Sequence, residues 1–111
     1  MDHLFCYGSL RPGASHTHLL EKVPGYWSKA FIKAEFHDRG WSEGNGYPGL
    51  VLDDHADWLE GDVYSSNDFG QLWASLDEWE GEEYIRVPAT VKRFDGSYFN
   101  AQVYVLNLQQ D

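Results

Sequence analysis

The sequence predicts an α+β fold with a mostly antiparallel sheet that can curl into a barrel. Most apolar segments are short or alternate with polar residues, which is the periodicity of β-strands. One segment, residues 67–80, has instead the apolar spacing of an amphipathic helix. The pair Asp95-Gly96 between two alternating stretches is typical of a tight hairpin turn. With 111 residues, 42% of them hydrophobic, we expect one domain over residues 1–111 with a single real core.

The N-terminal part of the chain predicts two strands separated by a loop and a short helix. His3–Tyr7 is an apolar run and is expected to be a buried strand, and residues 9–13 form the loop after it. Residues 15–21 are expected to form a short helix with Ser15 as its N-cap. Residues 25–36 alternate, which predicts a strand with one wet face. The face expected to be buried contains Tyr26, Ala30, Ile32, Ala34 and Phe36.

The rest of the chain predicts a loop, four strands and the longer helix. Residues 38–48 are rich in Gly, Asn and Asp and are expected to form a loop. Gly49–Leu52 and Leu59–Tyr64 are two further short strands. Tyr84–Phe94 and Tyr98–Leu106 are the clearest strands, and the Asp95-Gly96 turn joins them.

A helix is expected over Asn67–Glu80, because its apolar residues recur at i, i+3, i+4 and i+7. Asn67 or Ser66 is the expected N-cap, and Gly81 is a stop signal. The residues of the apolar arc are Phe69, Leu72, Trp73 and Leu76.

Glu80 is the acid that departs from the pattern of this helix. On a helical wheel it falls in the middle of the apolar arc, whereas Glu78 points to solvent. A partly desolvated carboxylate has a raised pKa and can exchange protons near neutrality, so Glu80 is a candidate general acid/base. The alternative is that the last helical turn frays, so that Glu80 reaches water or pairs with Arg86.

Charge and composition exclude several classes of partner. The chain carries 18 acidic and 8 basic side chains, and residues 40–85 contain twelve acids and no Lys or Arg. Such a chain repels phosphate backbones and anionic membrane surfaces, so neither nucleic acid nor a membrane is an expected partner. Cys6 is the single cysteine, which rules out an internal disulfide. We see no pattern of a secretory signal and no apolar run of about 18–20 residues, so we expect a cytoplasmic protein.

Weaker signals were weighed for binding and metal chemistry. The segment from Tyr7 to Leu10 joins a strand to a Gly-containing loop, which can expose backbone N–H groups to an anion or be an ordinary turn. His16 and His18 lie two residues apart without a third ligand at a fixed spacing, so no metal site is expected. Cys6 is expected to be a small core residue rather than a reactive thiol.

Four segments, in this order along the chain, resemble the gamma-glutamylcyclotransferase-like family. They are Leu4–Gly13 with Tyr-Gly-Ser-Leu at its centre, Tyr47–Val51, Leu59–Tyr64, and Leu76–Gly81 with the pattern Leu-Asp-x-x-Glu-Gly. Tyr84, Arg86 and the final hairpin also fit, so that the resemblance extends from about His3 to Leu106. The first and fourth segments together are specific to the family.

The resemblance implies a small β-barrel flanked by helices with a cavity at one end. It implies that Glu80 is the general acid/base, and that the residues binding the γ-glutamyl moiety are Tyr7, Gly8, Ser9, Leu10 and Tyr84. The implied reaction releases 5-oxoproline from a γ-glutamyl amine or a small γ-glutamyl peptide, with no metal or cofactor. A non-catalytic small-molecule-binding or regulatory module of the same fold is the alternative.

Two features near Glu80 depart from the family pattern. Trp79 is bulkier than the residue expected before the catalytic Glu. Glu82 and Glu83 bring further negative charge close to the site, and we expect them to raise the pKa of Glu80 or to repel acidic substrates.

Overall fold

A computed structural model describes residues 1–8, 10–37 and 49–107 of the chain, in which six strands form one sheet. The expected loop at 38–48 lies outside the described residues. The strands are β1 (Asp2–Cys6), β2 (Tyr26–His37), β3 (Gly49–Leu52), β4 (Trp58–Ser66), β5 (Tyr84–Arg93) and β6 (Tyr98–Leu106).

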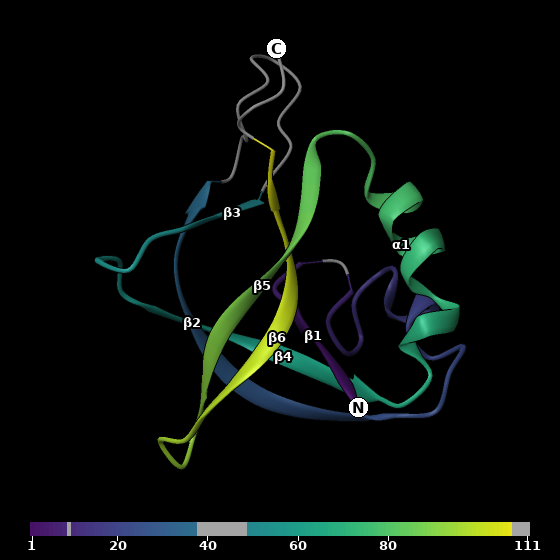
Figure 1. The fold of residues 1–111 in the computed structure, drawn as a ribbon, viewed down its shortest axis with the longest axis horizontal. Helices are drawn as coiled ribbons and strands as arrows, with labels where there is room; N and C mark the ends of the chain where they lie inside the picture. The colour runs from purple at the N-terminus through teal and green to yellow at the C-terminus, as the bar shows by residue number, and fades with distance from the viewer. Residues whose placement is uncertain (9, 38–48, 108–111) are drawn as a thin grey trace.

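Five of the strands close into a barrel, which confirms the predicted fold class. The ring runs β1–β4–β2–β5–β6, and a parallel pairing of β6 with β1 closes it. The other four pairings of the ring are antiparallel. β3 is an additional strand that pairs with the end of β2 and touches β6 (Figure 1). β5 and β6 form the expected hairpin, and Gly96 supplies the positive φ of 89° at its turn.

The side chains of the barrel form two packed layers because successive residues of a strand point to opposite faces. Alternate residues of the strands fill the interior, among them Phe5, Ala30, Ile32, Val63 and Val103. Their neighbours in the sequence point outward and pack against the loops and helical turns on one flank, among them Leu4, Cys6, Tyr64 and Tyr104.

The predicted inner face of β2 is correct in its centre and wrong at its ends. Ala30, Ile32 and Ala34 are buried as expected, but Tyr26 is 53% and Phe36 49% exposed. β2 has twelve residues, and the pairing with β5 that closes this side of the ring involves only Ala30 and Phe31 near its centre. At one of these ends, Phe36 contributes to a cavity instead of the core.

The helical segments are shorter than predicted. Residues 15–21 form only a 3₁₀ turn, η1 (Thr17–Leu19), and Ser15 does not cap it: His16 precedes the turn and makes no side-chain capping bond. So short a segment forms too few hydrogen bonds to offset the cost of helix nucleation.

The predicted helix over 67–80 is divided in two. It begins as a 3₁₀ turn, η2 (Phe69–Gln71), passes through Leu72 and continues as α1 (Trp73–Glu80). Gly70 in the first turn weakens a continuous α-helix, because glycine loses much backbone entropy when it is ordered. The predicted N-caps Asn67 and Ser66 are both wrong, because Asp68 precedes the first turn and makes no side-chain capping bond. The Oγ of Ser66 accepts the N–H of Asp68 at 3.0 Å, one residue before the turn begins.

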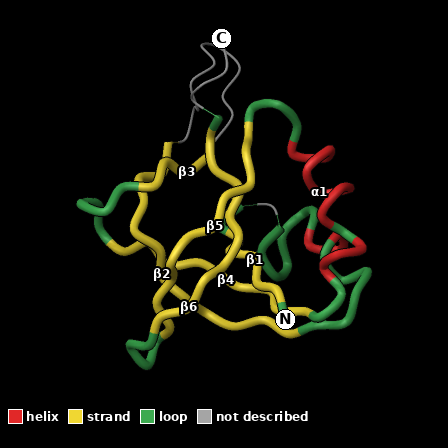
Figure 2. Tube along the Cα trace, viewed as in Figure 1, coloured by secondary structure: helices red, strands yellow, loops and turns green. Residues whose placement is uncertain are grey.

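The helical turns lie together on one side of the barrel (Figure 2). Leu20, Phe69, Leu72 and Leu76 project from them into the outer layer of the core. None of the helices in the described part of the chain has the length and apolar character needed to cross a membrane.

Candidate active site

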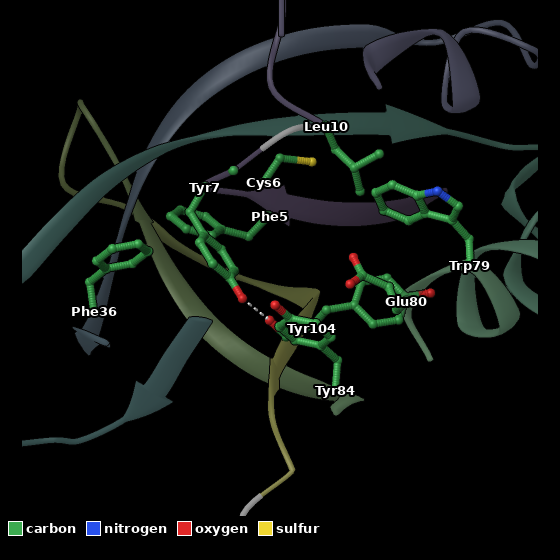
Figure 3. A pocket seen from close by; sticks show the side chains of 10 residues that line it. Phe5, Cys6, Tyr7, Leu10, Phe36, Trp79, Glu80, Tyr84 and Tyr104 are labelled. Carbon is green, nitrogen blue, oxygen red and sulfur yellow. Dashed lines mark hydrogen bonds between the residues drawn. The ribbon is translucent and has the colours of Figure 1, made fainter. Parts of the chain in front are cut away.

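A cavity of about 340 Å³ lies where the end of β1 meets the end of α1 (Figure 3). This is within the size range of small-molecule sites. Its walls are mostly aromatic or aliphatic. The residues that line it are Phe5, Cys6, Tyr7, Gly8, Leu10, Phe36, Trp79, Glu80, Tyr84 and Tyr104.

Glu80 is the carboxylate on the wall of this cavity, and the local structure of α1 places it there. It lies one turn after Leu76, which is 2% exposed, so both residues are on the face of α1 that packs on the barrel. Gly81 ends the helix at once with a φ of 83°, and its N–H donates to the carbonyl of Asp77. In Figure 3 the Glu80 carboxyl points into the cavity.

Burial raises the pKa of Glu80 to about 7, and the negative charge of Asp77 adds to the rise. The sequence predicts this effect for Glu82 and Glu83, but the charge that raises the pKa of Glu80 is that of Asp77. The expected alternative partner, Arg86, bonds to Asp77 rather than to Glu80. Glu80 thus combines a partly desolvated carboxyl with a pKa close to neutrality.

Two tyrosines of the cavity, Tyr7 and Tyr104, are joined by a hydrogen bond. The hydroxyl of Tyr7 donates to the backbone carbonyl of Tyr104 at 2.5 Å and accepts the N–H of Leu50 at 3.4 Å. The hydroxyl of Tyr104 donates to Oδ1 of Asp77 at 2.6 Å. Burial raises the pKa of both phenols, so both are neutral at physiological pH.

The segment after β1 is held against the barrel by an ion pair between the half-exposed Arg11 and the buried Asp62. The N–H of Arg11 donates to the carbonyl of Gly8 at 3.1 Å, and Arg11 Nε donates to Asp62 Oδ2 at 2.7 Å. Asp62 is 3% exposed and also pairs with Lys29 at 2.8 Å. Burial alone raises the pKa of the Asp62 carboxyl, but the hydrogen bonds from Lys29 and Arg11 outweigh it and lower the pKa.

The structure brings together nearly all of the site residues that the sequence singled out. Tyr7, Gly8, Leu10, Glu80 and Tyr84 all line the one cavity. Ser9 lies outside the described residues.

Sequence reasoning missed several residues of this wall, because they meet only when the barrel closes. Phe5, Phe36 and Tyr104 come from three different strands. Residues of β6 alternate between its two faces, and Tyr104 lies on the other face from the buried Val103 and Val105. This alternation was the signal in the sequence that could have identified Tyr104. Cys6 is a buried core residue as expected, but it also lines the cavity.

The histidines and Trp79 meet at the edge of the site. The ring of His16 lies 4.9 Å from that of Trp79 and 6.2 Å from that of His18. Among the residues that the structure describes, no three His, Cys, Asp or Glu side chains are grouped to hold a metal ion. The residues of the cavity suit proton transfer and the binding of a small organic molecule.

Comparison with known proteins identifies a matching family. A family model described as gamma-glutamyl cyclotransferase, AIG2-like, matches residues 4–111. No curated protein matches the sequence significantly.

Solved structures share the fold at low sequence identity. YkqA from Bacillus subtilis superposes with a TM-score of 0.74 at 24% identity, over 96% of this chain and 36% of YkqA. An AIG2-like protein from Mus musculus gives a TM-score of 0.71 at 23% identity, over 100% of this chain and 80% of that protein. A gamma-glutamyl cyclotransferase gives 0.67 at 18% identity, over 96% of this chain and 66% of that enzyme. This chain therefore spans about a third of the length of YkqA and most of the length of the mouse protein.

Proposed function

The chain belongs to the gamma-glutamyl cyclotransferase, AIG2-like family, and on this premise we propose that it releases 5-oxoproline from a γ-glutamyl amine or a small γ-glutamyl peptide. The observation that carries the proposal is the Glu80 carboxyl. It has a pKa of about 7 and faces a cavity of mostly apolar side chains. A group with this pKa can both accept and donate a proton at physiological pH.

The reaction is an internal acyl transfer. The α-amine of the γ-glutamyl unit attacks the γ-carbonyl of the same molecule, a new C–N bond closes the five-membered ring, and the original amide C–N bond breaks. Because the nucleophile is already attached to the carbonyl, the protein has to fold the substrate and move protons. Water is not consumed, and the products are 5-oxoproline and the free amine.

Glu80 serves both proton transfers in this scheme. The α-ammonium group cannot attack while it is protonated, so ionised Glu80 first removes a proton from it. Glu80, now protonated, gives that proton to the nitrogen of the departing amine as the amide bond breaks. This transfer regenerates the carboxylate. The attacking nitrogen still carries a second proton, which passes by the same route to the departing amine. The amine leaves as an ammonium ion, so no proton is gained or lost overall.

The remaining cavity residues hold the substrate in its folded conformation. Backbone N–H groups of the segment from Gly8 to Leu10 bind the substrate carboxylate and the oxyanion that develops on the γ-carbonyl. In a chain of net charge −10 such neutral donors are an effective way to bind an anion. The rings of Tyr7 and Tyr84 form the wall against which the substrate folds.

Incubation with a panel of γ-glutamyl amines and γ-glutamyl dipeptides tests the proposal. We expect at least one compound to yield 5-oxoproline and free amine in equal amounts, as measured by liquid chromatography and mass spectrometry. Binding of the same compounds is followed by calorimetry. Compounds that bind but yield no 5-oxoproline would contradict the proposal and favour a non-catalytic binding module.

The pH dependence of turnover is a second prediction. The ordinary pKa of a glutamate is 4.5, and burial and Asp77 raise that of Glu80 to about 7. Below the raised pKa Glu80 is protonated and cannot accept the proton of the α-ammonium group. We therefore expect kcat/KM to rise with pH through about 7, measured as initial rates between pH 5 and 8.5. A rate that is already constant above pH 5.5 would contradict the assignment of Glu80 as the base.

A further inference from the structure

Asp77 lies one helical turn before Glu80, and three hydrogen bonds fix its carboxylate. Arg86 donates through Nε to Oδ1 at 2.9 Å and through Nη2 to Oδ2 at 3.1 Å. The hydroxyl of Tyr104 donates to Oδ1 at 2.6 Å. Residues three apart in a helix are surface neighbours with Cβ atoms about 5–6 Å apart. A fixed carboxylate is thus held close to Glu80.

The position of Arg86 is in turn set by the core. Its guanidinium lies over the ring of Trp73, 4.3 Å from the centroid. Trp73 stacks on Phe69 with the ring centroids 4.4 Å apart, and Phe69 is fully buried. This column of rings orients the guanidinium so that it meets Asp77 with two of its nitrogens, Nε and Nη2. Such a bidentate pair, with two parallel hydrogen bonds, fixes the relative orientation of guanidinium and carboxylate more closely than a single-bonded surface ion pair does.

The Asp77–Arg86 pair lies behind the cavity and not in it. A second hollow of about 230 Å³ is lined by Asp77, Tyr84, Ile85, Arg86 and Tyr104. Tyr84 and Tyr104 line the Glu80 cavity as well, and so they separate the two spaces. Asp77 and Arg86 are not among the residues lining the Glu80 cavity, so they act on Glu80 through their charges rather than by touching a substrate.

The two members of the pair act on Glu80 in opposite directions. The hydrogen bond from Arg86 lowers the pKa of Asp77, which is therefore ionised at any pH at which Glu80 titrates. Its negative charge disfavours a second negative charge on Glu80. Arg86 carries the opposite charge and binds the Asp77 carboxylate directly, so its removal leaves the charge of Asp77 uncompensated. The proton equilibrium of Glu80 thus depends on both charges.

Three of the titratable groups around Glu80 are neutral near physiological pH. Burial raises the pKa of the Cys6 thiol and of the Tyr7 and Tyr104 phenols, so these groups are uncharged. The titratable residues that line the cavity with Glu80 are Cys6, Tyr7, Tyr84 and Tyr104. The charged groups beyond this lining are Asp62 with its partners Arg11 and Lys29 near Cys6, and Arg86 with Asp77, and the His16 ring lies against Trp79.

We propose that Asp77 and Arg86 are positioning residues, which together set the charge environment in which Glu80 takes up and releases the proton of the reaction. This inference rests on the proposed function, in which Glu80 is the proton carrier. Neither residue has to touch the substrate, because a charge acts on Glu80 through space. The Arg86 and Asp77 side chains are 27% and 44% exposed, so water screens part of this interaction and the expected changes are modest.

The test is a titration of the Glu80 carboxyl by carbon-detected NMR in the full-length chain and in single-residue variants. We expect Asp77→Asn to lower the pKa of Glu80 by about 0.5–1, since it removes a like charge. We expect Arg86→Gln to raise it by about 0.3–0.5, since it leaves Asp77 uncompensated. Arg86→Lys keeps the positive charge and should change it by less than about 0.3.

The matched control is Glu78→Gln, which removes the same charge from the same helix on its exposed side. It should leave the pKa of Glu80 nearly unchanged. If Glu78→Gln moves the pKa as much as Asp77→Asn, or if Asp77→Asn and Arg86→Gln move it in the same direction, the inference is wrong. In the latter case loss of packing, and not the sign of the charge, would account for the change.

The titration does not need a substrate, which separates this inference from the proposed function. In enzyme assays, the low-pH limb of kcat/KM should follow the titrated pKa of each variant. If Asp77→Asn and Arg86→Gln shift the pKa of Glu80 in opposite directions but no γ-glutamyl compound is turned over, the positioning role of the two residues is supported and the proposed reaction is contradicted. Turnover whose pH limb is the same in all variants would support the reaction and contradict the positioning role.

Discussion

Glu80→Gln should reduce kcat for 5-oxoproline release by about 10²–10⁴-fold, the usual contribution of general acid–base catalysis. The amide has nearly the size of the carboxyl and fits the same place in the wall, but it cannot accept the proton of the α-ammonium group. Binding of the substrate should change little, because in the proposed reaction Glu80 moves a proton and the neighbouring segment holds the anion. The measurement is kcat and KM for the best compound of the γ-glutamyl panel.

Glu78→Gln is the control for this substitution as well. Glu78 is exposed on the other side of α1, so its amide variant should keep full activity and the same thermal unfolding curve. Circular dichroism and thermal unfolding of Glu80→Gln establish that it is folded. A folded Glu80→Gln protein with the activity of the unaltered chain would overturn the assignment of Glu80 as acid/base.

Gly61→Ala should lower the free energy of unfolding by about 3 kcal/mol, through overpacking of the barrel wall. A Cβ on Gly61 of β4 would lie 2.4 Å from Cζ of Phe5 and 2.8 Å from the backbone oxygen of Cys6. Phe5 is 2% exposed and packed in the barrel interior, so its ring cannot move aside freely. Urea unfolding followed by fluorescence measures the loss.

Gly70→Ala is the matched control for this glycine substitution. Apart from its neighbours in the chain and the backbone of its own helical turn, no described residue has an atom within 4 Å of the place where its Cβ would lie. Alanine in this helical turn should leave the stability unchanged or raise it by about 0.5–1 kcal/mol, because it reduces the freedom of the unfolded chain. Equal stability of the Gly61→Ala and Gly70→Ala proteins would show that β1 and β4 are not packed as closely as described.

Gly61→Ala should also affect the site, because Phe5 and Cys6 line the cavity. The displaced ring would alter the wall opposite Glu80 and weaken substrate binding. This connects the packing of the barrel to the chemistry at its end.

Features that depend on neighbours in the sequence could be predicted well. The position of Glu80 follows from its spacing of four residues from Leu76, and the Asp95-Gly96 turn follows from the backbone freedom of glycine. The alternation in β2 identified Ala30, Ile32 and Ala34 as buried. In each case the periodicity of the local backbone decides which side of the element a residue occupies.

The lengths of the helices could not be predicted to the same degree. The helical wheel drawn for residues 67–80 assumes one continuous α-helix. The chain instead forms the 3₁₀ turn η2 and then the helix α1. Glu80 still faces the cavity because it and Leu76 both belong to the second part. The break at Leu72 follows Gly70, and the apolar spacing on which the wheel is based does not register the entropy that this glycine loses when it is ordered.

The sequence by itself determined the fold class, the candidate acid/base and the segment after β1 that accompanies it. Only the tertiary structure decided what surrounds the carboxyl. The pairing of β6 with β1 joins residues almost 100 positions apart, and it brings Tyr104 to Tyr7 and to Asp77. Burial and the Asp77 charge, which raise the pKa of Glu80, arise at this junction of barrel and helix. Electrostatic interactions act over distance in space and not along the chain, so a spacing of residues can indicate a site but the closed barrel sets its chemistry.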